Sequence, residues 1–214
     1  AVKYGPVAEF YDSFLALSGF KVAVERFLDR MDFNLPSRPR ILDAGCGTGL
    51  LSFYLAQRFP DSEIYASDID VKMLCEMERL LKKNGGANIA IYESDLKTPG
   101  RLGELRSHKI LTLPPDFFDL IAVSGALEHV PLSETAAKLS QLLKPGGIFF
   151  NLAMRKDAAG AILALMYEVR PYTVQEMRRA FEEAGLEEIS VYRLSAEDFP
   201  ANLSRVAVIA RKKI

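Results

Sequence analysis

Residues 41–50 place an acid and three evenly spaced glycines between an apolar strand pattern and an apolar helix pattern. Asp43 is followed by Gly45, Gly47 and Gly49. Glycines at alternate positions allow a tight turn and let a ligand approach bare main chain, and the helix that follows adds unpaired N–H groups. The pattern predicts a ligand-binding loop, and the alternative is a strand–helix turn without a ligand. Its glycine spacing differs from the G-x-G-x-x-G fingerprint of dinucleotide-binding loops.

Two further acids follow the second and third strand patterns. Asp68 ends the apolar run 64–67, where a carboxylate can accept hydrogen bonds from both hydroxyls of a ribose. Charge-assisted hydrogen bonds of this kind contribute about 1.5–3 kcal/mol each. The alternative role of Asp68 is to cap the next helix, but Asp70 is better placed for that. Asp95 follows the third strand pattern, and its alternative is a plain loop carboxylate.

Acid–base chemistry near neutral pH is predicted for the segment 124–130, which leaves the fourth strand pattern. It contains His129, whose ordinary pKa suits proton transfer, with Glu128 beside it. These two residues are the candidate catalytic groups. The alternative is that His129 only begins the next helix, just ahead of Pro131.

Composition sets limits on the class of protein. The chain has 214 residues, 49% of them hydrophobic and 26% charged, which is typical of one globular domain. Twenty-seven basic and 28 acidic side chains give a net charge of −1, so we expect no nucleic-acid or membrane partner. The two cysteines and two histidines are far apart, which predicts no disulfide framework and no metal site. No signal-peptide or membrane-span pattern is found, and we expect a cytoplasmic protein.

Strand and helix patterns alternate from residue 40 onward, which indicates a doubly wound α/β sheet with ligands at the carboxyl ends of its strands. Strands are expected over 40–44, 63–67, 88–92, 118–124, 147–153, 188–194 and 204–211. Helices are expected over 6–17, 20–34, 49–58, 70–84, 132–143, 158–168 and 173–184. Residues 97–117 are interpreted as a long, proline-bearing connection.

The glycine loop resembles the first motif of the class I S-adenosylmethionine-dependent methyltransferases, D/E-x-G-x-G-x-G, whose four positions are filled by Asp43, Gly45, Gly47 and Gly49. The last two strand patterns have no helix between them, and this ending is similar to that family's sheet. The resemblance covers residues 40–212. It implies a Rossmann-like sheet of seven mostly parallel strands with an antiparallel last strand, and S-adenosylmethionine as the cofactor.

The resemblance also implies one domain over residues 1–214, with a helical N-terminal cap over 1–36 and a cofactor-binding core over 37–214. Asp43 would orient the loop or reach the cofactor's ammonium group through water. Cys46 is included among the cofactor-binding residues as part of the loop. It is interpreted as a small filler side chain and not as a nucleophile, because no base lies near it in sequence.

Further cofactor contacts follow from the same resemblance. Asp68 would hold the ribose, Ile69 would pack on the adenine face, and Asp95 and Leu96 would bind the adenine edge. The longer connection after Asp95 departs from the family's usual pattern, which makes this last assignment the less specific one.

Main chain at Ser124 and Gly125 would face the methionine part of the cofactor. Tyr11, in the N-terminal arm, would touch the cofactor carboxylate, or would pack its helix onto the domain instead. Arg170 and Tyr172 are the candidate substrate-binding residues, and the alternative for this segment is a buried helix that ends at Pro171.

The resemblance implies transfer of a methyl group to an oxygen, nitrogen or carbon of a small-molecule acceptor. The alternatives are a methyltransferase that acts on RNA or protein, and a catalytically silent module that binds S-adenosylmethionine. A nicotinamide-dependent oxidoreductase is disfavoured by the glycine spacing. The sequence leaves the acceptor and the oligomeric state open, because acceptor pockets in this fold are built from variable loops.

Overall fold

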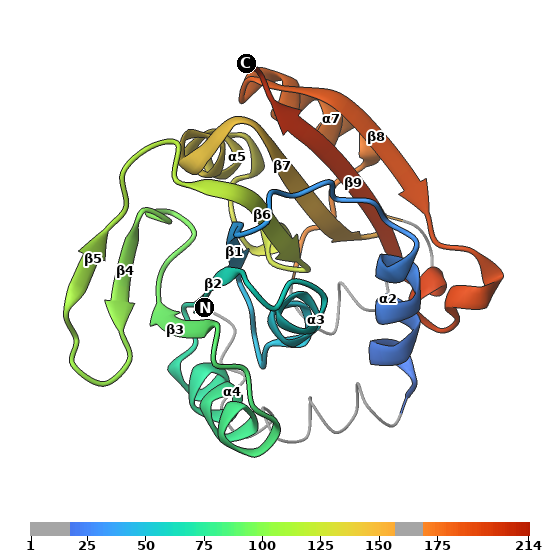
Figure 1. Ribbon diagram of the computed structural model, residues 1–214. Coiled ribbons are helices and arrows are strands. Elements are labelled where there is room, and N and C mark those ends of the chain that lie inside the picture. Colours follow the sequence, from blue (N-terminus) through green and yellow to red (C-terminus); the bar gives the residue numbers. More distant parts are fainter. Residues whose placement is uncertain (1–17, 157–168) are drawn as a thin grey trace.

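The computed structural model describes residues 18–156 and 169–214, and the helices expected over 6–17 and 158–168 lie outside these ranges. A nine-stranded sheet with the order β5-β4-β3-β2-β1-β6-β7-β9-β8 forms the middle of the described part (Figure 1). The strands are β1 (Arg40–Ala44), β2 (Glu63–Asp68), β3 (Ile89–Glu93), β4 (Arg101–Glu104), β5 (Ile110–Thr112), β6 (Phe118–Ser124), β7 (Leu143–Met154), β8 (Leu186–Arg193) and β9 (Arg205–Lys212).

The five central strands are parallel, as the near-continuous apolar patterns predict. In β1, Ile41 lies opposite Ile64 of β2 on one side and Leu120 of β6 on the other. These strands therefore bring their carboxyl ends to one edge of the sheet. β9 lies between β7 and β8 and is antiparallel to both, which confirms the expected antiparallel last strand.

The expected count of seven strands is wrong, because the segment interpreted as a connection contains β4 and β5. They form an antiparallel hairpin beyond β3, with Arg101 opposite Thr112. The two strands are only four and three residues long, and every residue of β5 is exposed. Strands this short and exposed show no clear alternation of apolar and polar residues in the sequence. They form because β4 pairs with the free edge of β3.

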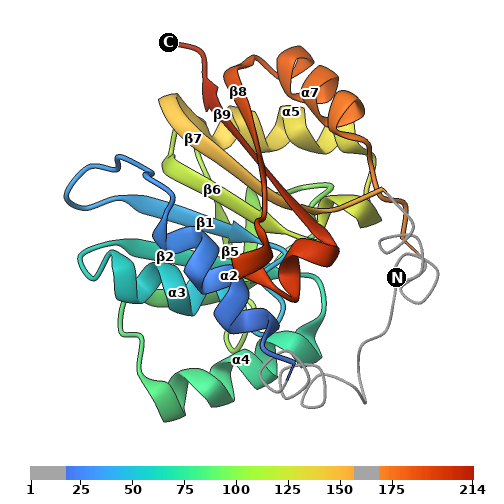
Figure 2. The same ribbon diagram turned by 90° about the vertical axis from the view of Figure 1, so that its right-hand side faces the viewer.

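Helices cover both faces of the sheet, as Figure 2 shows. α2, α3 and α4 pack on one face, and α5 and α7 pack on the other. The described helices are α2 (Phe20–Asp29), α3 (Leu50–Arg58), α4 (Val71–Asn84), α5 (Leu132–Leu142) and α7 (Val174–Glu183), with the 3-10 turns η1 (Leu127–His129), η2 (Ala196–Asp198) and η3 (Ala201–Leu203).

Only part of the expected N-terminal cap can be described, and its second helix is shorter than the predicted 20–34. α2 ends at Asp29, and the next residues run on without helical structure. Arg30 then forms a bidentate ion pair with the buried Asp198, at 2.6 and 2.7 Å. This pair joins the end of α2 to η2, so α2 is fixed against the segment between β8 and β9.

None of the described helices combines the length and apolar character that crossing a membrane requires. Among the described residues, no group of three or more His, Cys, Asp or Glu side chains is arranged to hold a metal ion.

Candidate active site

The glycine loop connects the carboxyl end of β1 to α3. Gly45, Gly47 and Gly49 all have positive φ angles, of 75°, 55° and 97°, a region that other residues enter only with strain. The N–H groups of Gly45 and Cys46 donate to the Ser67 carbonyl at 2.7 and 2.9 Å. The loop is therefore held in shape by the main chain of β2.

The two sides of the loop differ in the space around them. A Cβ on Gly45 would lie 2.3 Å from the Cβ of Ala126 and 3.9 Å from Cδ1 of Leu96. A Cβ on Gly47 would meet no described atom within 4 Å. The loop is thus pressed against the segment after β6 at Gly45, while at Gly47 its bare main chain faces open space.

Asp43 lies beneath the loop and is 1% exposed. Its Oδ2 accepts a hydrogen bond from the Ser52 hydroxyl at 2.6 Å. Burial raises the pKa of Asp43 to about 7, the nearby Asp68 carboxylate raises it further, and the hydrogen bonds from Ser52 oppose both effects. Asp43 therefore links β1 to the first turn of α3 from below the loop.

Asp68 ends β2 beside the open part of the loop. Its Oδ2 accepts from the Gly47 N–H at 2.8 Å, and its Oδ1 accepts from the Asp70 N–H at 2.9 Å. Burial raises the pKa of Asp68 against these backbone hydrogen bonds. Each carboxylate oxygen keeps capacity for a second hydrogen bond, so the group can hold the loop and still accept from the hydroxyls of a ligand.

The sequence left two roles open for Asp68, which are binding a ribose and capping the next helix. Asp70 caps α4, because its side chain accepts from the Lys72 N–H at 2.9 Å, which confirms the predicted cap. Ile69 lies between the two acids and is 56% exposed. Packing of this exposed side chain on the adenine of a cofactor stays a prediction.

The segment after β3 is set by its own turn. The Asp95 side chain accepts from the Lys97 N–H at 2.8 Å, and its carbonyl accepts from the Thr98 N–H at 2.8 Å. These are the contacts of a loop carboxylate, and the role of Asp95 toward an adenine stays a prediction. Leu96 lies near Gly45 and so borders the same loop.

Cys46 is buried within the loop and is not arranged as a nucleophile. Its Sγ lies 3.8 Å from Sδ of Met77. Burial raises the pKa of the Cys46 thiol well above its ordinary value, and the charges of Asp43 and Asp68 add to this effect. The thiol is therefore protonated at neutral pH, as expected for a small filler.

The end of β6 places the two candidate catalytic residues differently. Glu128 is 5% exposed, and its Oε1 accepts from the Met154 N–H at 2.5 Å. His129, the next residue, is exposed. Desolvation lowers the pKa of His129, while the charges of Glu128 and Asp68 raise it. His129 is thus a neutral imidazole at the rim near physiological pH, and Glu128 is an internal carboxylate.

The main chain at the end of β6 is the part predicted to face the methionine portion of a cofactor. Gly125 has a φ of 62°, and its N–H donates to the Leu152 carbonyl at 3.1 Å. Ser124, the last residue of β6, and Gly125 are both partly exposed. Their position, one strand over from the glycine loop, fits a contact with the methionine part of a cofactor, which stays a prediction.

Arg170 and Tyr172 lie against the segment after η1. The Tyr172 hydroxyl donates to the Val130 carbonyl at 2.8 Å, and the Arg170 N–H donates to the Glu128 carbonyl at 3.2 Å. The Arg170 guanidinium faces outward, 3.6 Å from Oε1 of Glu176. These contacts fix the start of the α7 segment, and substrate binding by the two residues stays a prediction. Tyr11 lies outside the described residues.

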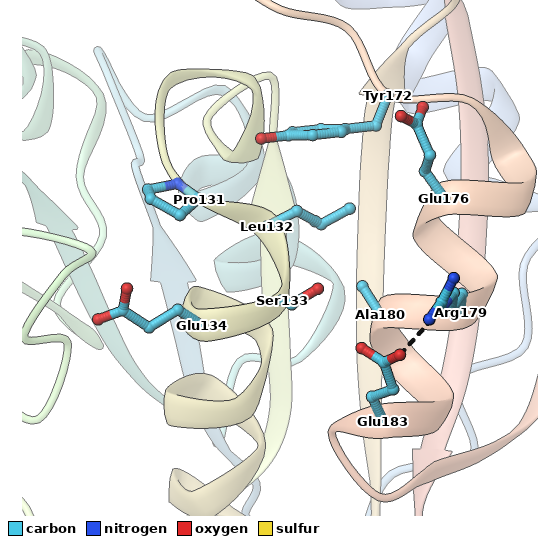
Figure 3. A pocket seen from close by; sticks show the side chains of 9 residues that line it. All are labelled: Pro131, Leu132, Ser133, Glu134, Tyr172, Glu176, Arg179, Ala180 and Glu183. Carbon is cyan, nitrogen blue, oxygen red and sulfur yellow. Dashed lines mark hydrogen bonds and ion pairs between the residues drawn. The ribbon is translucent and has the colours of Figure 1, made fainter.

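A groove of about 550 Å³ runs between α5 and α7, and Tyr172 lies at one end of it (Figure 3). Among the expected site residues that the structure describes, Tyr172 is the one that lines it. Charged side chains on α7 pair with each other there, as Arg179 does with Glu183 at 2.9 Å. Its lining residues are Pro131, Leu132, Ser133, Glu134, Tyr172, Glu176, Arg179, Ala180 and Glu183.

The structure also brings Arg205, which no sequence pattern indicated, to the site. Its Nη2 lies 3.7 Å from the position that a Cβ on Gly125 would take. Arg205 opens β9, 80 residues after Gly125 in the sequence. Its local pattern is only that of a strand end, and the sheet topology is what makes the two residues neighbours.

Comparisons with known proteins agree with this geometry. Residues 41–147 match the family model described as a methyltransferase domain. The ubiquinone biosynthesis O-methyltransferase of Azoarcus sp. (strain BH72) is 32% identical over 128 residues, which is 59% of this chain and 49% of that protein. The malonyl-[acyl-carrier protein] O-methyltransferase of Magnetococcus marinus is 32% identical over 119 residues, 55% of this chain and 39% of that protein.

The fold also matches solved methyltransferases. The geranyl diphosphate C-methyltransferase of Streptomyces coelicolor A3(2), solved with S-adenosyl-L-homocysteine, gives a TM-score of 0.70 at 13% identity, over 91% of this chain and 79% of that chain. At this identity the likeness shows the fold alone. The chain spans about half or less of the length of the two curated relatives. From the family match and the glycine loop together, the chain belongs to the class I methyltransferase domains, whose cofactor is S-adenosylmethionine.

Proposed function

We propose that this chain transfers the methyl group of S-adenosylmethionine to an oxygen, nitrogen or carbon atom of a small-molecule acceptor. The observation that carries the proposal is the opening at Gly47, where bare main chain and the Asp68 carboxylate face the same space at the carboxyl ends of β1 and β2. The two relatives named O-methyltransferases support the class of reaction.

The residues present fit this cofactor. Asp68 is held in place by two backbone N–H groups and keeps acceptor capacity for ribose hydroxyls. Ile69 offers its exposed side chain to the adenine, and the main chain of Ser124 and Gly125 borders the methionine part. The bound cofactor supplies a methyl group on a sulfonium, which is already a good electrophile.

The protein therefore contributes mainly by alignment. A well-oriented pair of reactants can gain about 7–11 kcal/mol over free reactants in solution. If the acceptor atom carries a proton, His129 is the group placed to remove it, because its imidazole is exposed at the rim and its pKa is lowered by desolvation. Glu128 would act from inside, where it accepts from the Met154 N–H at the end of β7.

Titration calorimetry with several cofactors tests the cofactor site. S-adenosylhomocysteine should bind to the wild-type chain, and NAD should not. Asp68→Asn should weaken S-adenosylhomocysteine binding about 10- to 100-fold, because each charge-assisted hydrogen bond to the ribose is worth about 1.5–3 kcal/mol. Asp70→Asn is the matched control, because Asp70 caps α4 and should leave the affinity nearly unchanged.

A transfer assay then separates an enzyme from a silent binding module. Radiolabelled S-adenosylmethionine is incubated with a panel of small phenols, carboxylic acids and amines, and with bulk RNA and protein as competing acceptors. Label on a small molecule supports the proposal. In the titration, binding of NAD alone would contradict the proposed cofactor. In the transfer assay, label only on RNA or protein would contradict a small-molecule acceptor. Cofactor binding without any transfer would contradict the reaction itself.

A further inference from the structure

Unpaired polar atoms gather at the edge of the sheet where β6 and β7 end and β9 begins. Nε and Nη1 of Arg205, Oδ1 of Asn202 and Oε2 of Glu128 are all buried, and none has a hydrogen-bond partner in the described parts of the chain. The sheet brings them near each other, because Arg205 lies opposite Met154 in the β7–β9 pairing and the Met154 N–H donates to Glu128.

The Arg205 guanidinium is positioned by aromatic and main-chain neighbours. It lies over the Phe20 ring of α2, 5.3 Å from the ring centroid. Its Nη2 approaches Gly125, 3.7 Å from the position of a would-be Cβ. Gly125 is followed by Ala126, which touches the glycine loop at Gly45. Arg205 therefore borders the crevice on the side opposite β2.

Leaving these atoms unpaired is costly. A buried donor or acceptor without a partner costs about 1–3 kcal/mol, and more when it is charged, so such groups in native proteins mark a bound water, ion or ligand. Glu128 also has an unpaired carboxylate oxygen, but no ion pair between Glu128 and Arg205 is formed in the described residues. The guanidinium is a planar fork that matches a carboxylate in bidentate geometry.

We propose that Arg205 binds the carboxylate of an acidic small-molecule acceptor, between Phe20 and Gly125. The inference rests on the proposed methyl transfer and adds the chemical class of the acceptor to it. Gly125 follows β6, and Asp68 ends β2, two strands away in the sheet. The guanidinium beside Gly125 therefore lies on the opposite side of the glycine loop from Asp68, and we place the acceptor on that side. The charge of Glu128 disfavours a doubly charged phosphate beside it.

The test compares a carboxylate with its neutral amide on protein saturated with S-adenosylhomocysteine. Benzoate and benzamide share a ring and differ in charge, and phenyl phosphate is the third probe. By calorimetry, wild-type protein should bind benzoate at least 10-fold more tightly than benzamide, and more tightly than phenyl phosphate. Arg205→Gln should lose the preference for benzoate, and Arg205→Lys should keep part of it, because the lysine retains the charge without the fork.

Two controls separate the proposal from other roles of the residue. Arg193→Gln makes the same chemical change at an exposed position of β8, one strand away, and should behave as wild type. Melting curves establish that each variant is folded. Arg205→Gln should bind S-adenosylhomocysteine and methylthioadenosine, which lacks the amino-acid tail, as wild type does.

Three results would overturn the inference. If Arg205→Gln weakens S-adenosylhomocysteine at least 10-fold and leaves methylthioadenosine unchanged, Arg205 holds the cofactor's own carboxylate. If phenyl phosphate binds more tightly than benzoate, the subsite takes phosphate esters. If wild-type protein does not prefer benzoate to benzamide, the guanidinium is satisfied by water. A wild-type chain that fails to bind S-adenosylhomocysteine contradicts the proposed function itself, which the cofactor titration detects first.

Discussion

The two sides of the crevice satisfy their buried polar groups in different ways. On the β1–β2 side, the buried Asp43 is paired with Ser52, and the partly buried Asp68 with the N–H groups of Gly47 and Asp70. On the β6–β9 side, Glu128, Asn202 and Arg205 keep buried atoms without partners among the described residues.

This difference shows which part of the site is complete before a ligand binds. The cofactor side is preorganised by hydrogen bonds between neighbours in β1, β2 and their loops, so a ligand there meets a finished surface. The side opposite β2 joins segments that are distant in sequence, η1, β7 and β9. Its buried polar atoms have no partners among the described residues, and we propose that this side, built from distant segments, sets the choice of acceptor.

The largest effect is expected from a change that breaks the contact between the two sides. Gly45→Ala would place a Cβ 2.3 Å from the Cβ of Ala126, at a φ of 75°. Overpacking and a strained backbone each cost about 1–3 kcal/mol, so we expect a loss of about 2–6 kcal/mol in the free energy of unfolding, measured by urea denaturation. Cofactor binding should be lost with the loop geometry.

Gly47→Ala is the matched comparison. Its φ of 55° also disfavours alanine, but the new Cβ would meet no described atom within 4 Å. We expect a loss of about 1–2 kcal/mol in stability from backbone strain, with a fold that survives. Affinity for S-adenosylhomocysteine should nevertheless fall at least 10-fold, because the methyl group enters the opening. Wild-type affinity in Gly47→Ala would contradict a cofactor at this opening.

Local patterns predicted the glycine loop, the cap of α4 and the strands around them. The strand–glycine–helix pattern around Gly45 encodes its own turn, because each positive φ falls on a glycine. Asp70 was correctly predicted as the cap of α4 from its place at the start of an apolar helical stripe. The seven predicted strands are present, and the antiparallel pair at the end of the chain was predicted from the missing helix between them.

Long-range pairing was not predictable in the same way. The β4–β5 hairpin depends on the free edge of β3, and its exposed residues carry no period that marks a strand. Arg205 becomes a neighbour of Gly125 only when β9 inserts beside β7. The burial of Glu128 likewise depends on the Met154 N–H, 26 residues away in sequence. Such contacts are properties of the sheet and have no local sequence signature.

A second effect concerns the buried acid on the cofactor side. Burial raises the pKa of Asp43 to about 7 in the folded state, from an ordinary value of 3.8. The folded state therefore binds a proton that the unfolded state releases, and wild-type stability falls relative to Asp43→Asn as pH rises from about 4 through about 7. The difference between the two free energies of unfolding should change by up to about 4 kcal/mol across this window.

Urea denaturation at a series of pH values measures this difference. Asp61→Asn, at an exposed position, should follow the wild-type curve. The pKa of Asp68 is also raised by burial, so Asp43→Asn should keep a shallower slope of the same sign. Parallel curves for wild type and Asp43→Asn would show that Asp43 stays ionised beneath the loop, and the preorganised side would then hold two charged acids.

The smallest effect is expected at the rim between the two sides, where His129 is exposed beside Glu128. With a protonated acceptor, His129→Gln should slow methyl transfer about 100-fold, the lower end of the range for a general base, and leave S-adenosylhomocysteine affinity unchanged. Because desolvation lowers the pKa of His129 from 6.5, the wild-type rate should fall with pH below that value, and His129→Gln should lack this acid limb. His108→Gln, on the exposed turn between β4 and β5, should keep it. An unchanged rate and pH profile in His129→Gln would assign His129 a structural role at the end of η1, and the crevice would work by alignment alone.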